Sequence, residues 1–260
     1  MRALCLMYHD VVEPGREEES GFPGGPARIY KLPRPLFAAH LDAIGSTGAP
    51  VCNDVGSLSS GTTMPVLFTF DDGGVSFLDP IAGMLEAHGW RGHFFITTGR
   101  IGTAGFLSAP QLRELAARGH VVGSHSVHHP VRMAELPAAQ IAAEWSESKK
   151  ALEDILGAAA DTASVPGGYS SPVVAQAAAE AGYRVLFHSE PVTRQSTAGA
   201  LRLLGRFALM ESSPASLAAG LARGDKSPRA KLWAIRTAKK LAKAAGGDWL
   251  IRQHARRLDR

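Results

Sequence analysis

Hydrophobic and polar residues follow two periods along this chain, one typical of strands and one typical of helices. Short apolar runs rich in Val, Leu and Phe alternate with longer segments in which apolar residues recur every three or four positions. We predict strands at residues 3–10, 65–70, 91–98, 121–126, 162–168, 184–189 and 202–209. We predict helices at residues 35–48, 77–89, 108–120, 137–157 and 170–183, and a helical segment from residue 223 onward.

The order of these elements predicts an α/β fold with parallel strands. A helix between two strands returns the chain to the edge where the first strand started, so successive strands run in the same direction. A closed barrel and an open sheet both satisfy this pattern, and 260 residues are enough for a single barrel. Residues 13–35 are rich in Gly, Pro and charge, which predicts a long loop.

Charge is distributed unevenly along the chain. The whole chain has a formal net charge of +4, but residues 223–260 contain 12 Lys and Arg against 3 Asp and Glu. This segment therefore carries +9 and the remainder −5, so the remainder has no general attraction to a polyanion. We predict a main body over residues 1–222 and a basic helical tail over residues 223–260.

The basic tail has two interpretations. Leu232 and Ile235 fall on the apolar side of its helix, which favours packing against the body with the basic side in solvent. Contact with an anionic membrane surface or with a lipid-linked glycan is the alternative. We expect no nucleic acid partner, because aromatic residues do not alternate with the basic ones.

The chain shows no membrane-spanning or secretory pattern. It has no run of 18 apolar residues, and its first apolar run ends at His9 and Asp10, before a signal peptide could form. Cys5 and Cys52 lie in no CxxC pattern, which favours two reduced thiols. We therefore predict a cytoplasmic protein, with the inner face of the membrane as the second position.

Polar residues follow several predicted strands at the point where each one ends. In parallel α/β folds the carboxyl ends of the strands carry the active residues and meet at one rim. The strand ends here carry His9, Asp71, Asp72, His125, His129, Pro166, Gly167 and His188. We expect several of these side chains to converge.

Two histidines and a carboxylate among these residues suggest a metal site. If the first turn after residue 124 is helical, His125 and His129 share one face, and Asp72 supplies the third ligand. Two imidazoles and one carboxylate leave an open position for water, as catalytic zinc requires. The cation would also explain the adjacent carboxylates, since Asp71 stays free as a base. Surface histidines beside a turn are the plainer interpretation, and His128 is the rival ligand.

These residues form motifs that resemble the polysaccharide deacetylases, the NodB-type carbohydrate esterases. The motifs are "TFDDG" at residues 69–73, "HSVHH" at 125–129 and "PGG" at 166–168, and the resemblance runs from about residue 64 to 190. It implies that residues 1–222 form a distorted (β/α) barrel of seven or so parallel strands. It also implies removal of acetyl groups from sugars with a divalent metal, usually zinc.

The resemblance assigns roles to individual positions. It implies that Asp71 is the general base, that Asp72, His125 and His129 bind the metal, and that Ser126 supports the histidine loop.

The third motif departs from the family pattern. Where the family has Arg-Pro-Pro-Tyr-Gly, this chain has "SVPGG", so Ser164 stands in place of the Arg that orients the base. Arg206 or Arg184 is expected to substitute for it. Gly167 stands at the Tyr position, where its backbone N–H can still donate to an oxyanion, because that role needs no side chain.

The last family motif, a Leu-x-Leu-His strand end that supplies the catalytic acid, is missing near residues 205–213. The segment "LMYH" at residues 6–9 fits it instead, which resembles the circularly permuted arrangement of the poly-N-acetylglucosamine deacetylases. His9 is then the predicted acid. A structural role for His9, with His188 as the acid, is the alternative.

Together these features predict a metal-dependent hydrolase that removes N-acetyl groups from an amino-sugar glycan or a lipid-linked saccharide. Two alternatives remain open. One is a catalytically weak barrel that binds glycans, which the missing third-motif Arg favours. The other is hydrolysis of a C–N amide bond outside sugars by the same metal site.

Overall fold

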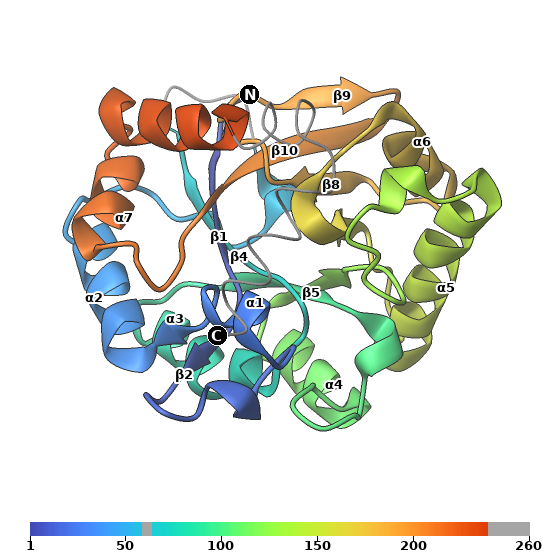
Figure 1. The fold of residues 1–260 in the computed structure, drawn as a ribbon, viewed down its shortest axis with the longest axis horizontal. Helices are drawn as coiled ribbons and strands as arrows, with labels where there is room; N and C mark the ends of the chain where they lie inside the picture. Colours follow the sequence, from blue (N-terminus) through green and yellow to red (C-terminus); the bar gives the residue numbers. More distant parts are fainter. Residues whose placement is uncertain (59–63, 239–260) are drawn as a thin grey trace.

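The computed structural model describes residues 1–58 and 64–238 (Figure 1). Its centre is a barrel of parallel strands, with helices around the outside. The barrel strands are β1 (Leu4–Tyr8), β4 (Val66–Phe70), β5 (Gly92–Ile96), β6 (Val121–Ser124), β7 (Thr162–Ser164), β8 (Val185–His188) and β10 (Leu201–Ala208). A short strand, β9 (Ser196–Ala198), pairs antiparallel with β10, and β2 (Val11–Val12) pairs with β3 (Leu32–Pro33) apart from the barrel.

Pairing between the first and last barrel strands closes the sheet. The strands follow the order β1-β4-β5-β6-β7-β8-β10, and β10 pairs in parallel with β1 at Cys5 and Arg206. Because all seven strands run in the same direction, their carboxyl ends form a single rim. The predicted parallel α/β barrel is therefore confirmed, and the open sheet is excluded.

Helices cover the outside of the barrel, with their apolar faces toward the strands (Figure 1). They are α2 (Arg34–Gly45), α3 (Gly83–Ala87), α4 (Ala109–Ala117), α5 (Ala138–Leu156), α6 (Pro172–Glu180) and α7 (Ala215–Ala222). The short helix α1 (Gly25–Arg28) belongs to the long N-terminal loop and buries none of its residues. In α5 an apolar stripe faces the barrel: Ile141, Trp145 and Leu152 are buried, and Ile155 is half-buried against the core. Burying each such side chain stabilises the fold by about 1.5–3 kcal/mol.

The single helix predicted at residues 77–89 is wrong in its first part. A 3-10 turn (Val75–Phe77) and a π-helical turn (Leu78–Ala82) precede α3, and Asp79 has extended dihedral angles. The residue before a proline avoids the α region because the proline ring clashes with it, and Pro80 follows Asp79. Helix α7 was not among the predicted elements.

Alternation along β4 decides which of its side chains face the inside of the barrel. Phe68 and Phe70 pack in the cluster shared with the outer helices. Leu67 belongs to a separate cluster with Phe95 and Phe187, which is drawn from several strands and therefore fills the barrel interior. By the same period of two, the residue that follows Phe70 points inward at the rim.

The described part of the tail packs against the body. Residues 226–238 are helical, and Leu232 contacts the core cluster that lines the outer helices. Trp233 and Ile235 are exposed, so the prediction that Ile235 lies on the packed side of this helix is wrong. The boundary at residue 222 stays a prediction, and the tail beyond residue 238 lies outside the described residues.

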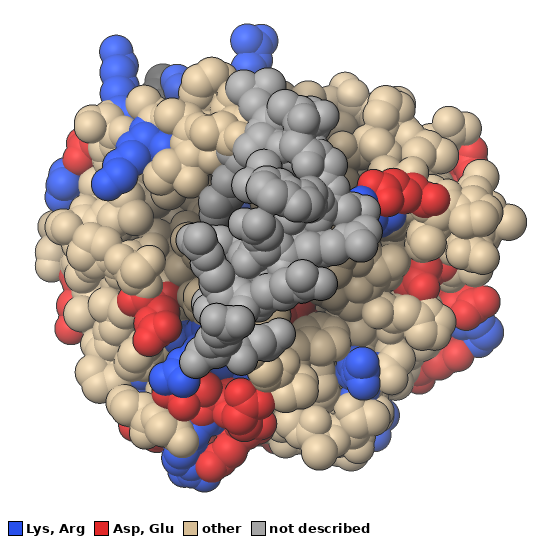
Figure 2. Space-filling view, in the orientation of Figure 1, with Lys and Arg blue, Asp and Glu red and all other residues tan. Residues whose placement is uncertain are grey.

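Charge on the surface follows the predicted asymmetry in part. On the face drawn in Figure 2, acidic and basic side chains are interspersed along the lower and right edges, whereas mainly basic ones lie at the upper left, over α7 and the start of the tail helix. Over residues 1–58 and 64–238, no helix is both long and apolar enough to cross a membrane.

Candidate active site

Asp71 and Asp72 lie at the rim, where β4 ends. The Asp71 N–H donates to the Tyr8 carbonyl at 3.1 Å, which continues the pairing of β4 with β1. Asp72 then has a φ of 91° and Gly73 one of 98°. A positive φ is uncommon outside glycine and often marks a functional site. The turn it makes breaks the alternation and keeps both carboxylates, each at most 9% exposed, at the same rim.

A bend brings His125 and His129 together, and not the helical turn that their spacing suggested. The strand ends at Ser124, and both Ser126 and His129 have positive φ, at 64° and 59°. The Ser126 N–H donates to the Ser124 hydroxyl at 3.0 Å, and the His129 N–H donates to the Ser126 hydroxyl at 3.1 Å. Such local serine bonds compete with helix formation. The two imidazole centres are still only 4.9 Å apart.

Glu144 of α5 fixes the same loop through hydrogen bonds. Its Oε2 accepts the N–H groups of Val127 and His128 at 2.9 Å each, and its Oε1 lies 2.7 Å from His128 Nδ1. The His128 side chain is 74% exposed and points to Glu144, so it does not join the other two histidines. Glu144 was not predicted. The sequence could have pointed to Glu144, because it lies among the apolar positions of α5, where a buried charge requires partners.

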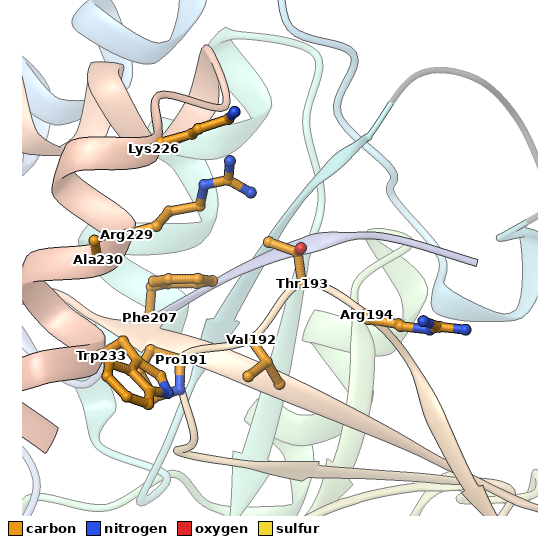
Figure 3. A pocket seen from close by; sticks show the side chains of 9 residues that line it. All are labelled: Pro191, Val192, Thr193, Arg194, Phe207, Lys226, Arg229, Ala230 and Trp233. Carbon is orange, nitrogen blue, oxygen red and sulfur yellow. The ribbon is translucent and has the colours of Figure 1, made fainter. Parts of the chain in front are cut away.

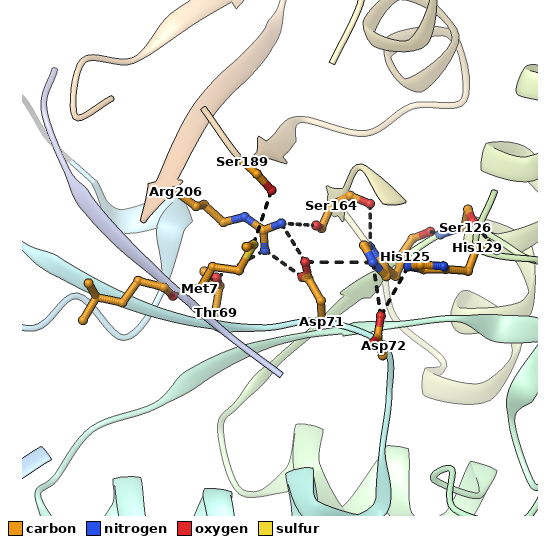
Figure 4. A network of polar contacts seen from close by, with 12 residues as sticks. Met7, Thr69, Asp71, Asp72, His125, Ser126, His129, Ser164, Ser189 and Arg206 are labelled. Carbon is orange, nitrogen blue, oxygen red and sulfur yellow. Dashed lines mark hydrogen bonds and ion pairs between the residues drawn. The ribbon is translucent and has the colours of Figure 1, made fainter. Parts of the chain in front are cut away.

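The imidazole of His125 presents a lone pair to Asp72. Its Nδ1 lies 2.9 Å from the Ser164 carbonyl oxygen, which can only accept, so Nδ1 carries the proton. Burial lowers the pKa of His125 to about 3, so its Nε2 is unprotonated at neutral pH. This Nε2 lies 3.5 Å from Asp72 Oδ1, and His129 Nε2 lies 3.4 Å from the same oxygen (Figure 4).

These donor atoms fit a divalent metal ion. Ligand atoms of Asp72, His125 and His129 all lie within 4.8 Å of one another. Asp72 Oδ1 is buried and has no hydrogen-bond partner among the described residues, and burial together with the Asp71 charge holds the pKa of Asp72 well above its ordinary value. Acceptors that face each other in this way repel unless a cation lies between them. Two imidazoles and a carboxylate suit zinc and leave positions open.

Arg206 of β10 forms a two-point ion pair with Asp71 inside the barrel. Its two terminal nitrogens donate to the two carboxylate oxygens of Asp71 at 2.7 Å each, and its Nη1 also donates to the Thr69 hydroxyl at 3.3 Å (Figure 4). Arg206 is 1% exposed. Two parallel charge-assisted bonds fix the orientation of the carboxylate as well as its charge.

The ion pair keeps Asp71 ionised. Burial alone would raise the pKa of Asp71, but the charge and hydrogen bonds of Arg206, together with nearby imidazoles, hold it well below its ordinary value. At neutral pH only Arg206 among these neighbours is charged, so it is Arg206 that keeps the pKa of Asp71 low. Burial lowers the pKa values of His125 and His9 to about 3 and about 4, so these imidazoles are uncharged.

Ser164 connects the ion pair to the histidine loop. Its hydroxyl lies 2.7 Å from Arg206 Nη2, while its carbonyl holds His125. Ser164, which stands where the family motif has an Arg, is thus a small side chain that the guanidinium of Arg206 contacts. Of the two expected substitutes, Arg184 is 78% exposed and lies 3.6 Å from Asp161, so only Arg206 reaches the carboxylate.

His9 follows the strand next to that of Asp71, whereas His188 is the register partner of Gly205, the residue before Arg206. Tyr8 and Phe70 are register partners in β1 and β4, so His9 follows one strand where Asp71 follows its neighbour. The charges of Asp71, Arg206 and His129 all influence the pKa of His9, whereas Arg206, Glu190 and Arg236 influence that of His188. The Nδ1 of His9 is buried and has no hydrogen-bond partner among the residues described.

Two aromatic residues of the long N-terminal loop complete this rim. The ring of Phe22 lies 5.0 Å from that of His129, and the ring of Tyr30 lies 4.5 Å from that of His9. The loop is anchored by Asp10, which is buried and accepts from the hydroxyls of Ser20 and Ser76. Sequence reasoning predicted only a loop here. Two aromatic residues in a segment of Gly, Pro and charge were the available signal.

Gly167 lies in a 3-10 turn (η7, Pro166–Gly168) directly after β7. Its φ is 63°, and a Cβ at this position would lie 2.5 Å from the carbonyl oxygen of Val131, so only glycine fits. Its role as an oxyanion donor stays a prediction.

The open pocket drawn in Figure 3 is separate from these residues. It lies between residues 191–194 and the tail helix and is lined by Pro191, Val192, Thr193, Arg194, Phe207, Lys226, Arg229, Ala230 and Trp233. None of the predicted site residues lines it.

Comparison with known proteins places the strand-end motifs in one family. Residues 60–186 match the profile of the polysaccharide deacetylase family. A chitin deacetylase from a Pestalotiopsis species is 32% identical over 130 residues, which are 47% of this chain and 43% of that protein. The Bacillus subtilis (strain 168) protein YxkH is 28% identical over 192 residues, or 72% of this chain and 64% of its own length. This chain therefore spans less than two thirds of either relative.

The fold of this chain is also similar to that of solved structures. The structure of IcaB from Ammonifex degensii superposes with a TM-score of 0.69 at 22% identity, and the match covers 85% of this chain and 97% of that one. The barrel is the distorted (β/α) barrel of NodB type that the motifs predict. The matched profile and the motifs identify residues 60–186 of this chain as a member of the polysaccharide deacetylase family, and the fold agrees with this.

Proposed function

We propose that this protein is a metal-dependent hydrolase that removes N-acetyl groups from an amino-sugar glycan or a lipid-linked saccharide. The observation that carries the proposal is the Asp71–Arg206 ion pair beside the acceptor cluster of Asp72, His125 and His129. One carboxylate is available to a metal, and the other is held ionised and oriented by a buried guanidinium. Membership in the polysaccharide deacetylase family supports the substrate class.

The proposed reaction begins with Asp71. A divalent metal held by Asp72, His125 and His129 would supply polarisation of the acetyl carbonyl and a lowered pKa for a water molecule. Asp71 takes a proton from the water molecule while the water oxygen forms a bond to the carbonyl carbon. Arg206 keeps the base ionised before this step and orients it, because both carboxylate oxygens accept from the guanidinium.

Collapse of the tetrahedral intermediate breaks the C–N bond and releases acetate and a free amine. The N–H of Gly167 donates to the oxyanion in this proposal, and His9 gives a proton to the leaving nitrogen. Because burial lowers the pKa of His9 to about 4, its imidazole is neutral at rest and must first receive a proton. The Asp71 acid formed in the first step is a source, since the two residues follow neighbouring strands.

The direct test is acetate release from a panel of acetylated compounds. It should include N-acetylglucosamine oligomers, lipid-linked N-acetylated sugars and small acetamides without a sugar. Release from a saccharide supports the proposal. Release only from the sugar-free acetamides would favour the amide hydrolase instead. Glycan binding without any release would favour the non-catalytic barrel.

The purified protein is expected to hold about one divalent metal ion per chain, zinc being the first expectation. Replacing both His125 and His129 by Ala removes two of three ligands, so the metal content should fall to near zero. Elemental analysis of the purified variants measures this. His128→Ala is the matched control, because its exposed side chain points to Glu144 and should leave the metal content unchanged. Equal metal content in all three proteins would reject the site.

His9→Ala is expected to impair amide hydrolysis more than hydrolysis of activated aryl esters. An amine leaves only when protonated, whereas an aryl oxide leaves without a proton, so the ratio of the two losses should reach about 10²-fold. Steady-state rates on an N-acetylated sugar and an aryl acetate measure that ratio. His188→Ala is the matched control and should change both rates equally. If the ratio moves in His188→Ala and stays constant in His9→Ala, the acid is His188.

A further inference from the structure

The tail helix reaches the rim of the barrel through Arg236. One terminal nitrogen of Arg236 donates to the Gly168 carbonyl at 3.1 Å. The guanidinium carbon lies 4.1 Å from the centre of the Tyr169 ring, and Nε lies 3.8 Å from Glu190 Oε1. The side chain is only 17% exposed. A residue from the tail therefore contacts the turn that carries Gly167.

This turn needs contacts from outside to stay in one conformation. Gly167 and Gly168 both have positive φ, and two adjacent glycines lose more conformational freedom on ordering than any other pair. A Cβ at Gly168 would lie within 2 Å of the Ser189 hydroxyl, so the side chain of Ser189, directly after β8, packs closely against the turn. The Gly168 carbonyl accepts from the Ser189 N–H at 3.1 Å and from Arg236 on another side.

The three contacts of Arg236 require a guanidinium. A planar group can stack on the Tyr169 ring while its Nη2 donates to the Gly168 carbonyl and its Nε faces Glu190. A Lys ammonium is a compact charge and cannot make all three contacts at once. The contact set connects the tail helix, the glycine turn after β7 and the segment after β8.

We propose that Arg236 is a positioning residue that fixes the Pro166–Gly168 turn and so directs the Gly167 N–H toward the reacting carbonyl. The tail helix is then a part of the catalytic barrel rather than an appendage. The catalytic half of this inference rests on the proposed deacetylase function, whereas the structural half does not.

The test compares Arg236→Ala and Arg236→Lys with Arg229→Ala in the full chain. Arg229 is the matched control, because it lies on the same helix and its guanidinium donates to Gly224 and Asp225 carbonyls near its own start. Hydrogen–deuterium exchange over residues 162–170 reports the turn without any need for activity. Acetate release gives kcat and KM, and elemental analysis gives metal content.

Arg236→Ala should increase exchange in this segment several-fold and lower kcat about tenfold, a fraction of the 10²–10³ for a lost oxyanion donor. KM and metal content should stay close to those of the wild type, and guanidinium ion added at millimolar concentration should restore part of kcat. Arg236→Lys should be intermediate, and it serves as the test if the Ala variant does not fold. Arg229→Ala should match the wild type.

Unchanged exchange in both Arg236 variants would overturn the positioning role whatever the activity. Increased exchange with unchanged kcat would overturn the link to the oxyanion donor. If the wild type releases no acetate from any substrate, the proposed function fails, and the exchange comparison still decides whether Arg236 holds the turn.

Discussion

Asp71→Asn is expected to keep the metal site intact and to lower kcat by about 10²–10⁴, the usual contribution of a general base. Asn has nearly the same shape, so Asp72, His125 and His129 keep their positions, but its amide cannot take a proton from water. Rates of acetate release, with metal content measured on the same samples, check this expectation. A rate near that of the wild type would show that Asp71 only builds the turn.

The charge left behind by this substitution needs its own control. Asn leaves the buried guanidinium of Arg206 without its carboxylate, and breaking a buried pair in this way costs about 3–5 kcal/mol of stability. Adding Arg206→Met removes the second charge as well. The double variant should regain stability against urea without regaining turnover. Turnover that recovers along with stability would mean that the loss in Asp71→Asn came from unfolding.

The fold was predictable because several strands of this barrel, such as β1 and β4, are apolar runs that end at polar residues. Buried parallel strands contact apolar groups on both faces, so their sequences read as short hydrophobic segments. All seven barrel strands were found in this way, including β1, whose end carries His9. Closure of the barrel was not predictable from the pattern, because the pairing of β10 with β1 joins residues at the two ends of the body.

The cluster of Asp72, His125 and His129 was predictable in its members but not in its geometry. The spacing of His125 and His129 suggested a helical turn, whereas positive φ at Ser126 and His129 produces a bend. Positive φ at residues other than glycine depends on the surrounding contacts, here the serine hydroxyls and Glu144, and no local preference reveals it. The conclusion that the two imidazoles meet was right for a different physical reason.

The sequence limited the cationic partner of Asp71 to two residues, Arg206 and Arg184, but could not decide between them. Arg206 lies in the middle of an apolar strand, where a charge needs a buried partner, while Arg184 precedes one. The choice depends on which strands are neighbours and which side chains face inward, and only the closed barrel defines both. The structure also explains the departure at residue 164, because the hydroxyl of Ser164 occupies the space beside the Arg206 guanidinium.

The spatial exchange between Ser164 and Arg206 leads to a prediction with opposite outcomes for single and double variants. Arg206→Ser should lower stability by about 3–5 kcal/mol, because it leaves the Asp71 carboxylate buried and unpaired, and it should also lower kcat. Ser164→Arg alone should be harmful too, since it forces a second guanidinium against the first. Urea unfolding and acetate release measure both effects.

Ser164→Arg combined with Arg206→Ser moves the guanidinium from β10 to β7, where the third motif of the family carries it. The double variant should therefore be more stable and more active than either single variant, with a coupling energy of about 0.5–3 kcal/mol. Arg184→Ser is the control, because its exposed pair with Asp161 contributes at most about 1 kcal/mol. If the stability and rate changes of Ser164→Arg and Arg206→Ser simply add up in the double variant, a guanidinium at residue 164 does not pair with Asp71 as the one at residue 206 does. A coupling of the expected sign would mean that the barrel needs a cation against this carboxylate and accepts it from either strand.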